Sequence, residues 1–302
     1  MTDFWLHPIP GFQLEIWEKL IGDWFFVFAL GFLVFELGLY ALRGKLSKSM
    51  AGDTVTNYIT LGFFIITTTL LFATFYVGVY FFAAEFAVFD IQTNLATLLI
   101  CLVLADLAYY WEHRILHRIN FLWATHSVHH SSPFFNISVA YRHGPLDGFW
   151  PLFFHLPLVL LGFDPLLVLV VELLVQLFQT ALHTEVIGKL WKPIELIFNT
   201  PSHHRVHHGS NRKYLDKNYA GIFIIWDRMF GTFAEEIEEV KYGLTRPINS
   251  VNPFVAFFHG FTRLGAEVAK ADGIYNKLSH LFGPPGWKPK KKPVETTFKE
   301  DK

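Results

Sequence analysis

The sequence predicts an all-helical, multi-pass membrane bundle that carries a histidine-rich helical cap on its cytosolic side. The 302-residue chain is 52% hydrophobic and only 17% charged, whereas soluble domains usually carry about a quarter charged residues. Its apolar residues form runs long enough to cross a bilayer, and these predict about four spanning helices or hairpins. Twelve of its 15 histidines fall between His113 and His208.

The apolar runs place the spans in order along the chain. Trp24 to Leu42, Tyr58 to Phe82 and Asn94 to Trp111 each predict one span. A fourth run, Phe149 to Leu182, is interrupted by Gly-Phe-Asp-Pro at 162–165. It predicts a helical hairpin that either reaches the far side of the membrane or re-enters.

The segments beside the first span indicate the orientation in the membrane. Gly11 to Gly22 predicts a short amphipathic helix lying on the interface, with an ordinary packed helix as the alternative. Arg43, Lys45 and Lys48 mark the loop after the first span as cytosolic. The histidine groups return to the same face, which we expect to be the cytosolic face of a bacterial inner membrane or of the endoplasmic reticulum.

The histidines have spacings typical of metal ligands. His113 and His117 are four residues apart, and an H-x-x-H-H motif at 126–130 recurs at 204–208. Residues three or four apart share one face of a helix, so His113 with His117, and His126 with His129 or His130, can aim two imidazoles at one point. Neutral imidazole binds iron, zinc, copper and nickel. The imidazoles exceed what one ion can use, so two metal ions are predicted.

Several motifs resemble the fatty acid hydroxylase superfamily, also called the sterol desaturase family. The resemblance covers roughly residues 90 to 245 and rests on the stretches Asp106–His117, Trp123–Ser132 and Asn218–Thr232. Within that family, Asn199–Asn211 and Asp216–Tyr219 are most similar to the alkylglycerol monooxygenase group.

The resemblance implies a membrane-bound pair of iron ions held by histidines rather than carboxylates. Gln179 stands where some relatives carry a further histidine, so one iron is either a ligand short or completed by water or by Gln179. The role of His143 is left open. The ligand positions are His113, His117, His126, His129, His130, His183, His204, His207 and His208, with His203 as an additional candidate or a neighbour of the ligands.

Histidine ligands need partners that orient their second ring nitrogens. Asp106, Asn136 and Asp227 are the candidate catalytic residues for this work, and Glu112 and Asp147 are further polar candidates. Asp106 is singled out because a carboxylate inside a membrane helix is costly unless it faces a site. Of the other histidines, one is expected in helix packing and three at the surface: His155, and His7, His259 and His280.

The predicted function is that of a diiron oxygenase which uses O2 to hydroxylate or desaturate a membrane lipid, with the similarity favouring hydroxylation beside an ether oxygen. A redox protein or a reduced pterin is the expected electron donor. The alternatives are a sterol or fatty-acid desaturase, or a non-enzymatic metal- or haem-binding transporter. The net charge of −1 gives no field for nucleic acid. A zinc protease is disfavoured because no H-E-x-x-H motif occurs.

Three regions follow from these assignments. Residues 1–93 hold the interfacial helix and the first two spans, and 94–245 form the catalytic fatty acid hydroxylase/sterol desaturase domain. Residues 246–302 are a C-terminal segment whose Pro- and Lys-rich tail, Gly283–Lys302, is expected to be disordered.

Overall fold

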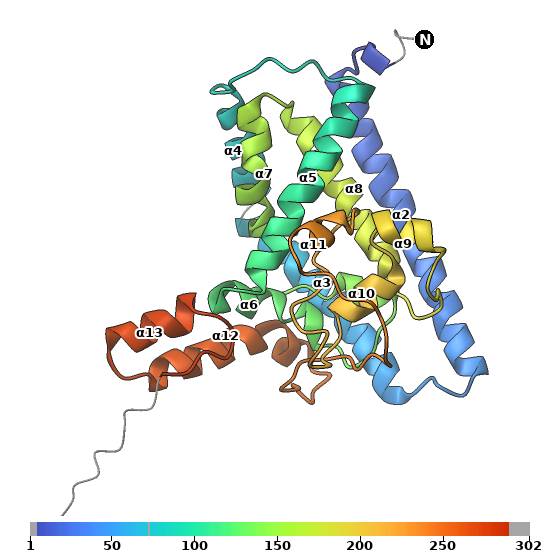
Figure 1. Ribbon diagram of the computed structural model, residues 1–302, viewed down its shortest axis with the longest axis vertical. Coiled ribbons are helices and arrows are strands. Elements are labelled where there is room, and N and C mark those ends of the chain that lie inside the picture. The colour runs from blue at the N-terminus through green and yellow to red at the C-terminus, as the bar shows by residue number, and fades with distance from the viewer. Residues whose placement is uncertain (1–4, 72, 290–302) are drawn as a thin grey trace, which may run out of the picture.

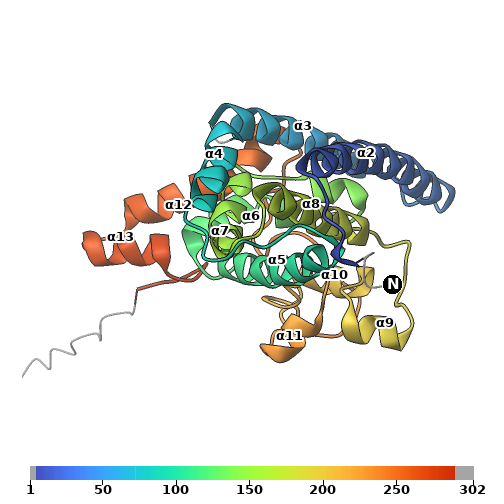
Figure 2. The same ribbon diagram turned by 90° about the horizontal axis from the view of Figure 1, so that it is seen from above.

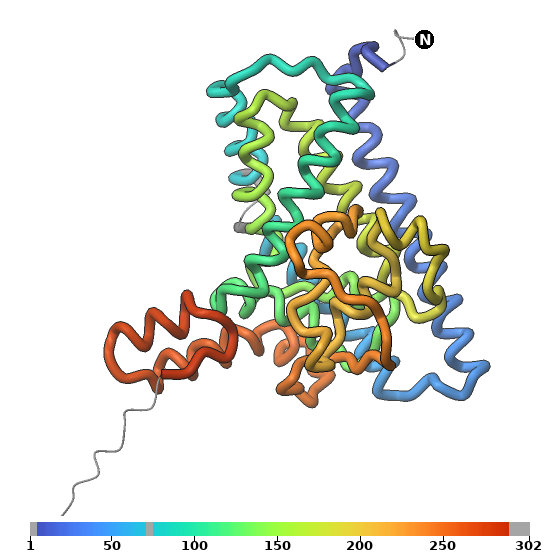
Figure 3. Tube along the Cα trace, in the orientation of Figure 1, coloured from blue at the N-terminus to red at the C-terminus, as the bar shows by residue number. Residues whose placement is uncertain are grey.

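Helices are the only regular elements in the part of this computed structural model that is described, residues 5–71 and 73–289. Figure 1 and the trace in Figure 3 show long helices standing side by side, with the shorter elements gathered at one end of the bundle. The predicted all-α membrane bundle is therefore confirmed. The predicted tail lies largely outside the described residues.

Three helices are long and apolar enough to cross a membrane: α2 (Gly11–Leu42), α5 (Leu95–Leu116) and α8 (Pro165–Leu182). Two more, α3 (Lys48–Leu71) and α4 (Ala73–Ala84), pass the same test as a pair but differ in direction by 51°. The structure thus has three spans, or four if the bent pair is one span, in agreement with the prediction.

Two predicted boundaries were wrong. The expected interfacial helix at 11–22 is continuous with the first span in the 32-residue helix α2. No proline interrupts it, and an exposed ion pair between Lys19 and Asp23, 2.8 Å apart, links one turn to the next. The second predicted span is divided between α3 and α4. Near the end of α3, Thr67 donates to the carbonyl of Phe63, a contact that often bends helices.

The predicted hairpin is present as α7 (Pro151–Leu161) and α8. Gly162 ends α7 with a left-handed φ of 117°, and a Cβ at this position would lie 2.0 Å from the carbonyl oxygen of Phe89. Only glycine fits such a backbone. Asp164 then begins α8, because its Oδ1 accepts a hydrogen bond of 2.7 Å from the amide of Leu166.

The centre of the bundle is apolar, with α8 packed against α2 and α5, and α5 packed against α7. One buried polar cluster interrupts it. Glu172 accepts hydrogen bonds from Tyr76 and Tyr80 at 2.9 and 2.5 Å. His155 lies 3.6 Å from the same carboxylate and contacts the carbonyl of Ala105 across the α5–α7 interface at 3.2 Å. His155 thus lies in a helix contact, where it was expected.

The cap is made of short helices that follow α5 and α8. Its first part, between α5 and α7, carries the first histidine motifs, and its second part follows α8. The elements are α6 (Asn120–His126), η1 (His129–Ser131), η2 (Ile137–Tyr141), η3 (Asp147–Phe149), α9 (Lys192–Ile197), α10 (Pro201–His207) and α11 (Ile225–Met229).

Two further helices, α12 (Pro253–Lys270) and α13 (Gly273–Phe282), form a hairpin at the C-terminal end of the described chain. Figure 2, which looks down the long helices, shows this hairpin projecting sideways from the bundle. No helix was predicted in this segment. The signal was present, since Asn252 caps α12 through its Oδ1 and Pro253 occupies the first turn.

A buried charge attaches α2 to the cap. Glu36 is fully buried within α2, and its carboxylate accepts a 2.8 Å hydrogen bond from the amide of Ile137 and another from the hydroxyl of Thr184. Ile137 begins η2, and Thr184 follows His183. One side chain of a spanning helix therefore fixes two cap segments that lie beside the histidines.

A second buried charge attaches α3 to the segment of the first H-x-x-H-H motif. The guanidinium of Arg142 donates to Asp53 at 3.0 Å and to Asn57 at 2.8 Å, both on α3. It also donates to the carbonyl of Val128 at 3.1 Å and to the hydroxyl of Ser131 at 2.8 Å. Because Arg142 is fully buried, its charge depends on these partners.

We therefore predict that Asp53→Asn destabilises the protein by about 3 kcal/mol, since it leaves the Arg142 charge buried without its carboxylate. Thermal unfolding of the detergent-purified protein, followed by tryptophan fluorescence, measures this. The matched control is Asp23→Asn, which breaks the exposed pair with Lys19 and should leave the midpoint unchanged. Equal midpoints for the two variants would contradict this prediction.

Candidate metal centre

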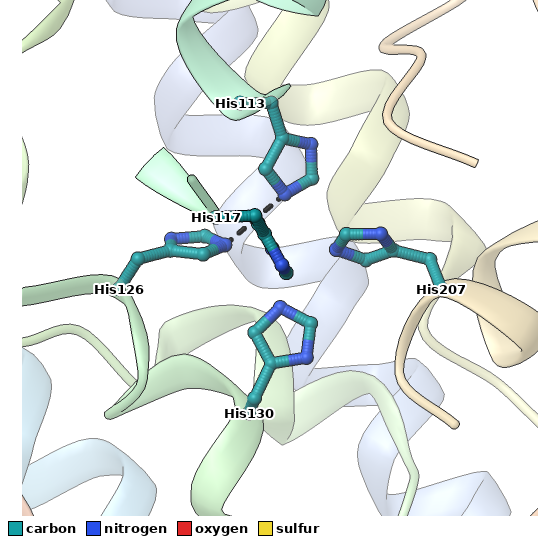
Figure 4. Close-up of side chains that lie close together, drawn as sticks. All are labelled: His113, His117, His126, His130 and His207. Atoms are coloured by element: carbon teal, nitrogen blue, oxygen red, sulfur yellow. Dashed lines mark hydrogen bonds between the residues drawn. The ribbon is translucent and has the colours of Figure 1, made fainter. Parts of the chain in front are cut away.

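The structure brings nine of the ten candidate histidines together in two buried groups. Within each group, one ligand atom from every member lies within 4.8 Å of the others. Figure 4 shows the rings of the larger group converging on a common centre. The five-histidine group is His113, His117, His126, His130 and His207, and the four-histidine group is His129, His183, His204 and His208.

Each H-x-x-H-H motif is divided between the two groups. His113 and His117 share the five-histidine group, as do His126 and His130, so these pairs aim at one point as their spacing predicted. Residues 126–130 are not one helix, because α6 ends at His126 and η1 begins at His129. The chain turns between them and sends His129 to the four-histidine group. In the second motif, His207 and His208 are neighbours about 100° apart around the axis of α10, so their rings diverge.

Backbone carbonyls fix the orientation of three rings. The Nδ1 atom of His113 donates to the carbonyl of Tyr219 at 2.9 Å, and that of His207 donates to Lys217 at 3.0 Å. His183 donates in the same way to Gln179 at 2.8 Å. A ring that donates from Nδ1 leaves the lone pair of Nε2 free for a metal, which is the usual arrangement around bound ions.

The spacing of the ring nitrogens fits one ion in each group. The Nε2 atoms of His113 and His126 are 3.1 Å apart. Those of His183 lie 3.2 Å from His129 and 3.0 Å from His204. Ligands about 2.1 Å from a shared ion sit about 3.0 to 3.4 Å from one another. Six ring nitrogens are also buried without a hydrogen-bond partner: His117 Nε2, His129 Nδ1, His130 Nε2, His204 Nδ1, His207 Nε2 and His208 Nε2.

Burial favours the neutral form of several of these imidazoles. It lowers the pKa of both His183 and His207 to about 3, although each ring also donates to a carbonyl, which raises the pKa. Burial and neighbouring histidines lower the pKa of His129 and His204 well below the usual value. Metal ligands must be deprotonated to bind. The groups are therefore ready to bind ions at neutral pH.

The tenth candidate, His203, lies outside the groups, as does His143, whose role was left open. His203 occupies the first turn of α10, but its Nε2 lies 3.9 Å from Glu195 and its ring contacts Phe233. His143 donates from Nδ1 to Asp147 at 2.8 Å. The other oxygen of Asp147 lies 3.7 Å from His126 Nδ1, which is too long for a hydrogen bond. Asp147 is thus an electrostatic neighbour of the five-histidine group.

Asp227 and Asn136 support the groups through the backbone. The carboxylate of Asp227 accepts hydrogen bonds of 2.9 and 2.8 Å from the amides of Tyr219 and Ala220. Because the Tyr219 carbonyl receives the proton of His113, Asp227 positions that ring through one residue of backbone. Asn136 caps η2 by accepting from the amide of Ser138 at 3.0 Å.

Asp106 is buried on α5 and faces the segment after Tyr219. Its carboxylate accepts from the amides of Ile222 and Phe223 at 2.5 and 2.9 Å, and from the indole of Trp226 at 2.8 Å. Among the hydrogen bonds of the described residues, none joins Asp106, Asn136 or Asp227 to a histidine ring. The three predicted catalytic residues therefore lie where they hold the scaffold.

A cavity of approximately 360 Å³ leads to the histidines from beside α6 and α12. Trp123 and Leu264 form part of its wall, and Arg246 and Arg263 lie at its edge. Its inner end is lined by four members of the two groups: His117, His130, His207 and His208. A molecule in this cavity would contact the same rings that face the candidate metal positions.

Comparison with known proteins agrees with this geometry. The sequence model of the family described as fatty acid hydroxylase matches residues 98–232, which contain both histidine groups. This part of the chain is therefore similar to the fatty acid hydroxylase family. The spans α2, α3 and α4 and the α12–α13 hairpin lie outside the matched residues.

The chain is also similar to several curated proteins. The chain is 49% identical over 187 residues to alkylglycerol monooxygenase from Homo sapiens, covering 62% of this chain and 41% of that protein. It is 38% identical over 210 residues to alkylglycerol monooxygenase from Caenorhabditis elegans, covering 64% and 40%. It is 31% identical over 133 residues to the ornithine lipid hydroxylase OlsE from Rhizobium tropici, covering 44% and 40%.

The chain spans about two fifths of the length of these curated relatives. No solved structure matches it.

The division into two groups predicts the metal content. Protein purified in detergent and loaded with ferrous iron should hold two ions per chain, and His204→Ala should lower this, because it removes a ligand of the four-histidine group. The matched control is His203→Ala, which removes the adjacent buried ring that lies outside both groups and should keep both ions. Elemental analysis measures this, and equal loss from the two variants would contradict the grouping.

The hydrogen bonds of Asp227 predict a weaker but related effect. Asp227→Asn replaces one acceptor oxygen with an N–H donor that opposes a backbone amide, so the Tyr219 carbonyl should shift from His113. Loss of such a supporting contact typically costs about 10- to 100-fold in metal affinity. Competition with a chelator measures the affinity. The half-exposed Asp216, 3.8 Å from His117, is the control, and Asp216→Asn should change affinity little.

Proposed function

We propose that this protein is a membrane-bound diiron oxygenase that uses O2 to hydroxylate a C–H bond of a lipid. The observation that carries the proposal is the pair of buried groups made only of histidines, within the residues that match the fatty acid hydroxylase family. The ligands are the nine grouped histidines, and the four-histidine group is completed by water or by the neighbouring Gln179. The proposed catalytic domain comprises residues 94–245.

Iron is the metal that suits the site and its relatives. Imidazole binds iron, zinc and copper alike, so the choice rests on chemistry. The named relatives are monooxygenases and a hydroxylase, and of these metals iron and copper can exchange electrons with O2, whereas zinc cannot. When bound, the two ions supply the redox chemistry that activates O2.

The protein residues shield the oxidation from bulk water and direct it to one C–H bond. The histidine groups are buried, and their orienting carbonyls come from two separate segments, the end of α8 and the loop at 217–219, so the rings hold one geometry. The reaction R–H + O2 + 2 e⁻ + 2 H⁺ → R–OH + H2O consumes two electrons. A redox protein or a reduced pterin would deliver them, and the cavity beside His117 and His208 gives access from outside the spans.

A membrane lipid is the substrate class that the fold favours. The spans place the histidines at one end of a bundle whose surface is rich in exposed aromatic side chains, so a lipid can approach from the bilayer. The alkylglycerol monooxygenases and the ornithine lipid hydroxylase are named for lipid substrates. Similarity to the former favours oxidation of the carbon beside an ether oxygen.

The cytosolic face is the proposed location of the site. The basic loop with Arg43, Lys45 and Lys48 follows α2 at the end of the bundle that bears the cap. Tyr40, at that end of α2, donates to Glu185 at 3.2 Å, two residues after His183. Positive loops remain on the cytosolic side, in a bacterial inner membrane or the endoplasmic reticulum.

Two alternatives make different predictions. A desaturase of the same superfamily would remove two hydrogens from the lipid and release two molecules of water, without adding oxygen to the product. A metal transporter would place its metal-binding residues along the spans, whereas both histidine groups lie at one end of them. Haem binding would give an optical band that a diiron protein lacks.

Isotope labelling tests the proposal directly. Iron-loaded protein in lipid nanodiscs, given a chemical reductant and ¹⁸O2, should add one ¹⁸O atom to a membrane lipid or ether lipid, as measured by mass spectrometry. The His204→Ala variant should abolish this addition. A product lighter by two hydrogens would establish the desaturase. Oxygen uptake no greater than in the His204→Ala variant, with iron bound, would reject an oxygenase.

A further inference from the structure

The α12–α13 hairpin, residues 253–282, exposes a continuous apolar face. On α13 the side chains of Ile274, Tyr275 and Phe282 are 71%, 75% and 64% exposed, and Leu278 is exposed beside them. Their spacing of one, four and eight residues puts all four on one face of the helix. Exposed aliphatic and aromatic side chains gathered in this way mark a site that contacts lipid or another apolar surface.

The base of the hairpin continues the surface of the spans. Phe254 of α12 packs against Phe63 of α3, with their rings 4.9 Å apart. Farther along α3, Ile66 and Leu70 are exposed on the apolar surface of the candidate span. Phe254 and Phe258 are exposed on α12, so apolar side chains of α3 and of the hairpin are neighbours at its base.

The opposite side of the hairpin is held firmly against the helix α6. Gly260 approaches so closely that a Cβ there would lie 1.9 Å from the carbonyl oxygen of Ala124. The ring of His259 accepts a 3.2 Å hydrogen bond from Ser127, between the first histidines of the motif. His259 was expected at the surface, and its burial follows from this contact. Asn120 donates to the carbonyl of His280 at 2.9 Å.

The orientation of the hairpin suits a bilayer surface. Figure 1 shows α12 and α13 lying across the direction of α5 and α8, beside the cap and outside the bundle. Amphipathic helices in this orientation lie in the plane of the membrane interface with their apolar face among the acyl chains. Lys270 and Lys277 are exposed on the same hairpin and can meet lipid headgroups.

We propose that the α12–α13 hairpin lies on the surface of the bilayer with the Ile274–Phe282 face in lipid. We propose also that the cavity between α12 and α6 admits lipid from that leaflet to the histidines. Gly260, Arg263 and Leu264 of α12 line this cavity, and His117 and His207 lie at its inner end. This second statement rests on the proposed oxygenase function, whereas the surface contact does not.

Spin labelling of the full chain in nanodiscs tests the surface contact. Cys101 is the only cysteine and is buried in α5, so a cysteine introduced at Ile274 or Leu278 can be labelled selectively. The label should collide with O2, which concentrates in lipid, and be shielded from a water-soluble nickel chelate. Lys277→Cys, on the same helix but off the apolar face, is the matched control and should show the reverse.

Two outcomes would overturn the surface contact. Labels at Ile274 and Lys277 that are equally open to the chelate would place the face in water. Spin–spin broadening at Ile274 would show that a second copy covers it. Neither measurement requires metal or turnover, so a failure of the oxygenase proposal does not affect them.

The entry role has its own test. The double variant Ile274→Ser/Leu278→Ser should raise the KM for lipid in bilayers about tenfold and leave kcat within about twofold, because it changes access and leaves the histidines intact. Iron content should be unchanged. An unaltered KM, with the spin labels in lipid, would reject the entry role and keep the surface contact. A fall in kcat with loss of iron would reject it as well, since the hairpin would then only support the fold.

Discussion

The structure depends on keeping nine imidazoles close together inside a protein. Their nitrogens approach to 3.0–3.2 Å, and lone pairs that face one another at this distance repel unless a cation lies between them. The carbonyls of Tyr219, Gln179 and Lys217 set the direction of three rings. The buried charges Glu36 and Arg142 then hold the segments that carry the other rings to the membrane helices.

The sequence predicted the features that depend on composition and spacing. The spans and the break at Gly162 follow from apolar runs and from turn chemistry, and the histidine motifs indicate metal ions wherever their elements pack. The division of each motif between two groups was not predictable. In the first motif it depends on α6 ending at His126 and η1 beginning at His129, and in the second on His207 and His208 facing different sides of α10.

The groups that orient the histidine rings could not be predicted from the sequence either, because they are backbone carbonyls. Every residue carries a backbone carbonyl, so residue type does not show that those of Tyr219 and Lys217 accept hydrogen bonds from histidines. The polar side chains chosen as candidates serve the loops that present those carbonyls, as Asp227 does for Tyr219. A left-handed backbone at Asp216 and Asn218, with φ of 59° and 55°, bends that loop toward His207, and asparagine and aspartate tolerate it better than most residues.

The sharing of each H-x-x-H-H motif between two groups links the two ion positions during assembly. His129 and His130 are consecutive but serve different groups, as are His207 and His208. An ion that orders one group therefore fixes the backbone that presents ligands to the other, and lowers the entropy lost when the second ion arrives. Metal loading is thus expected to be cooperative, with half-loaded chains scarce at equilibrium.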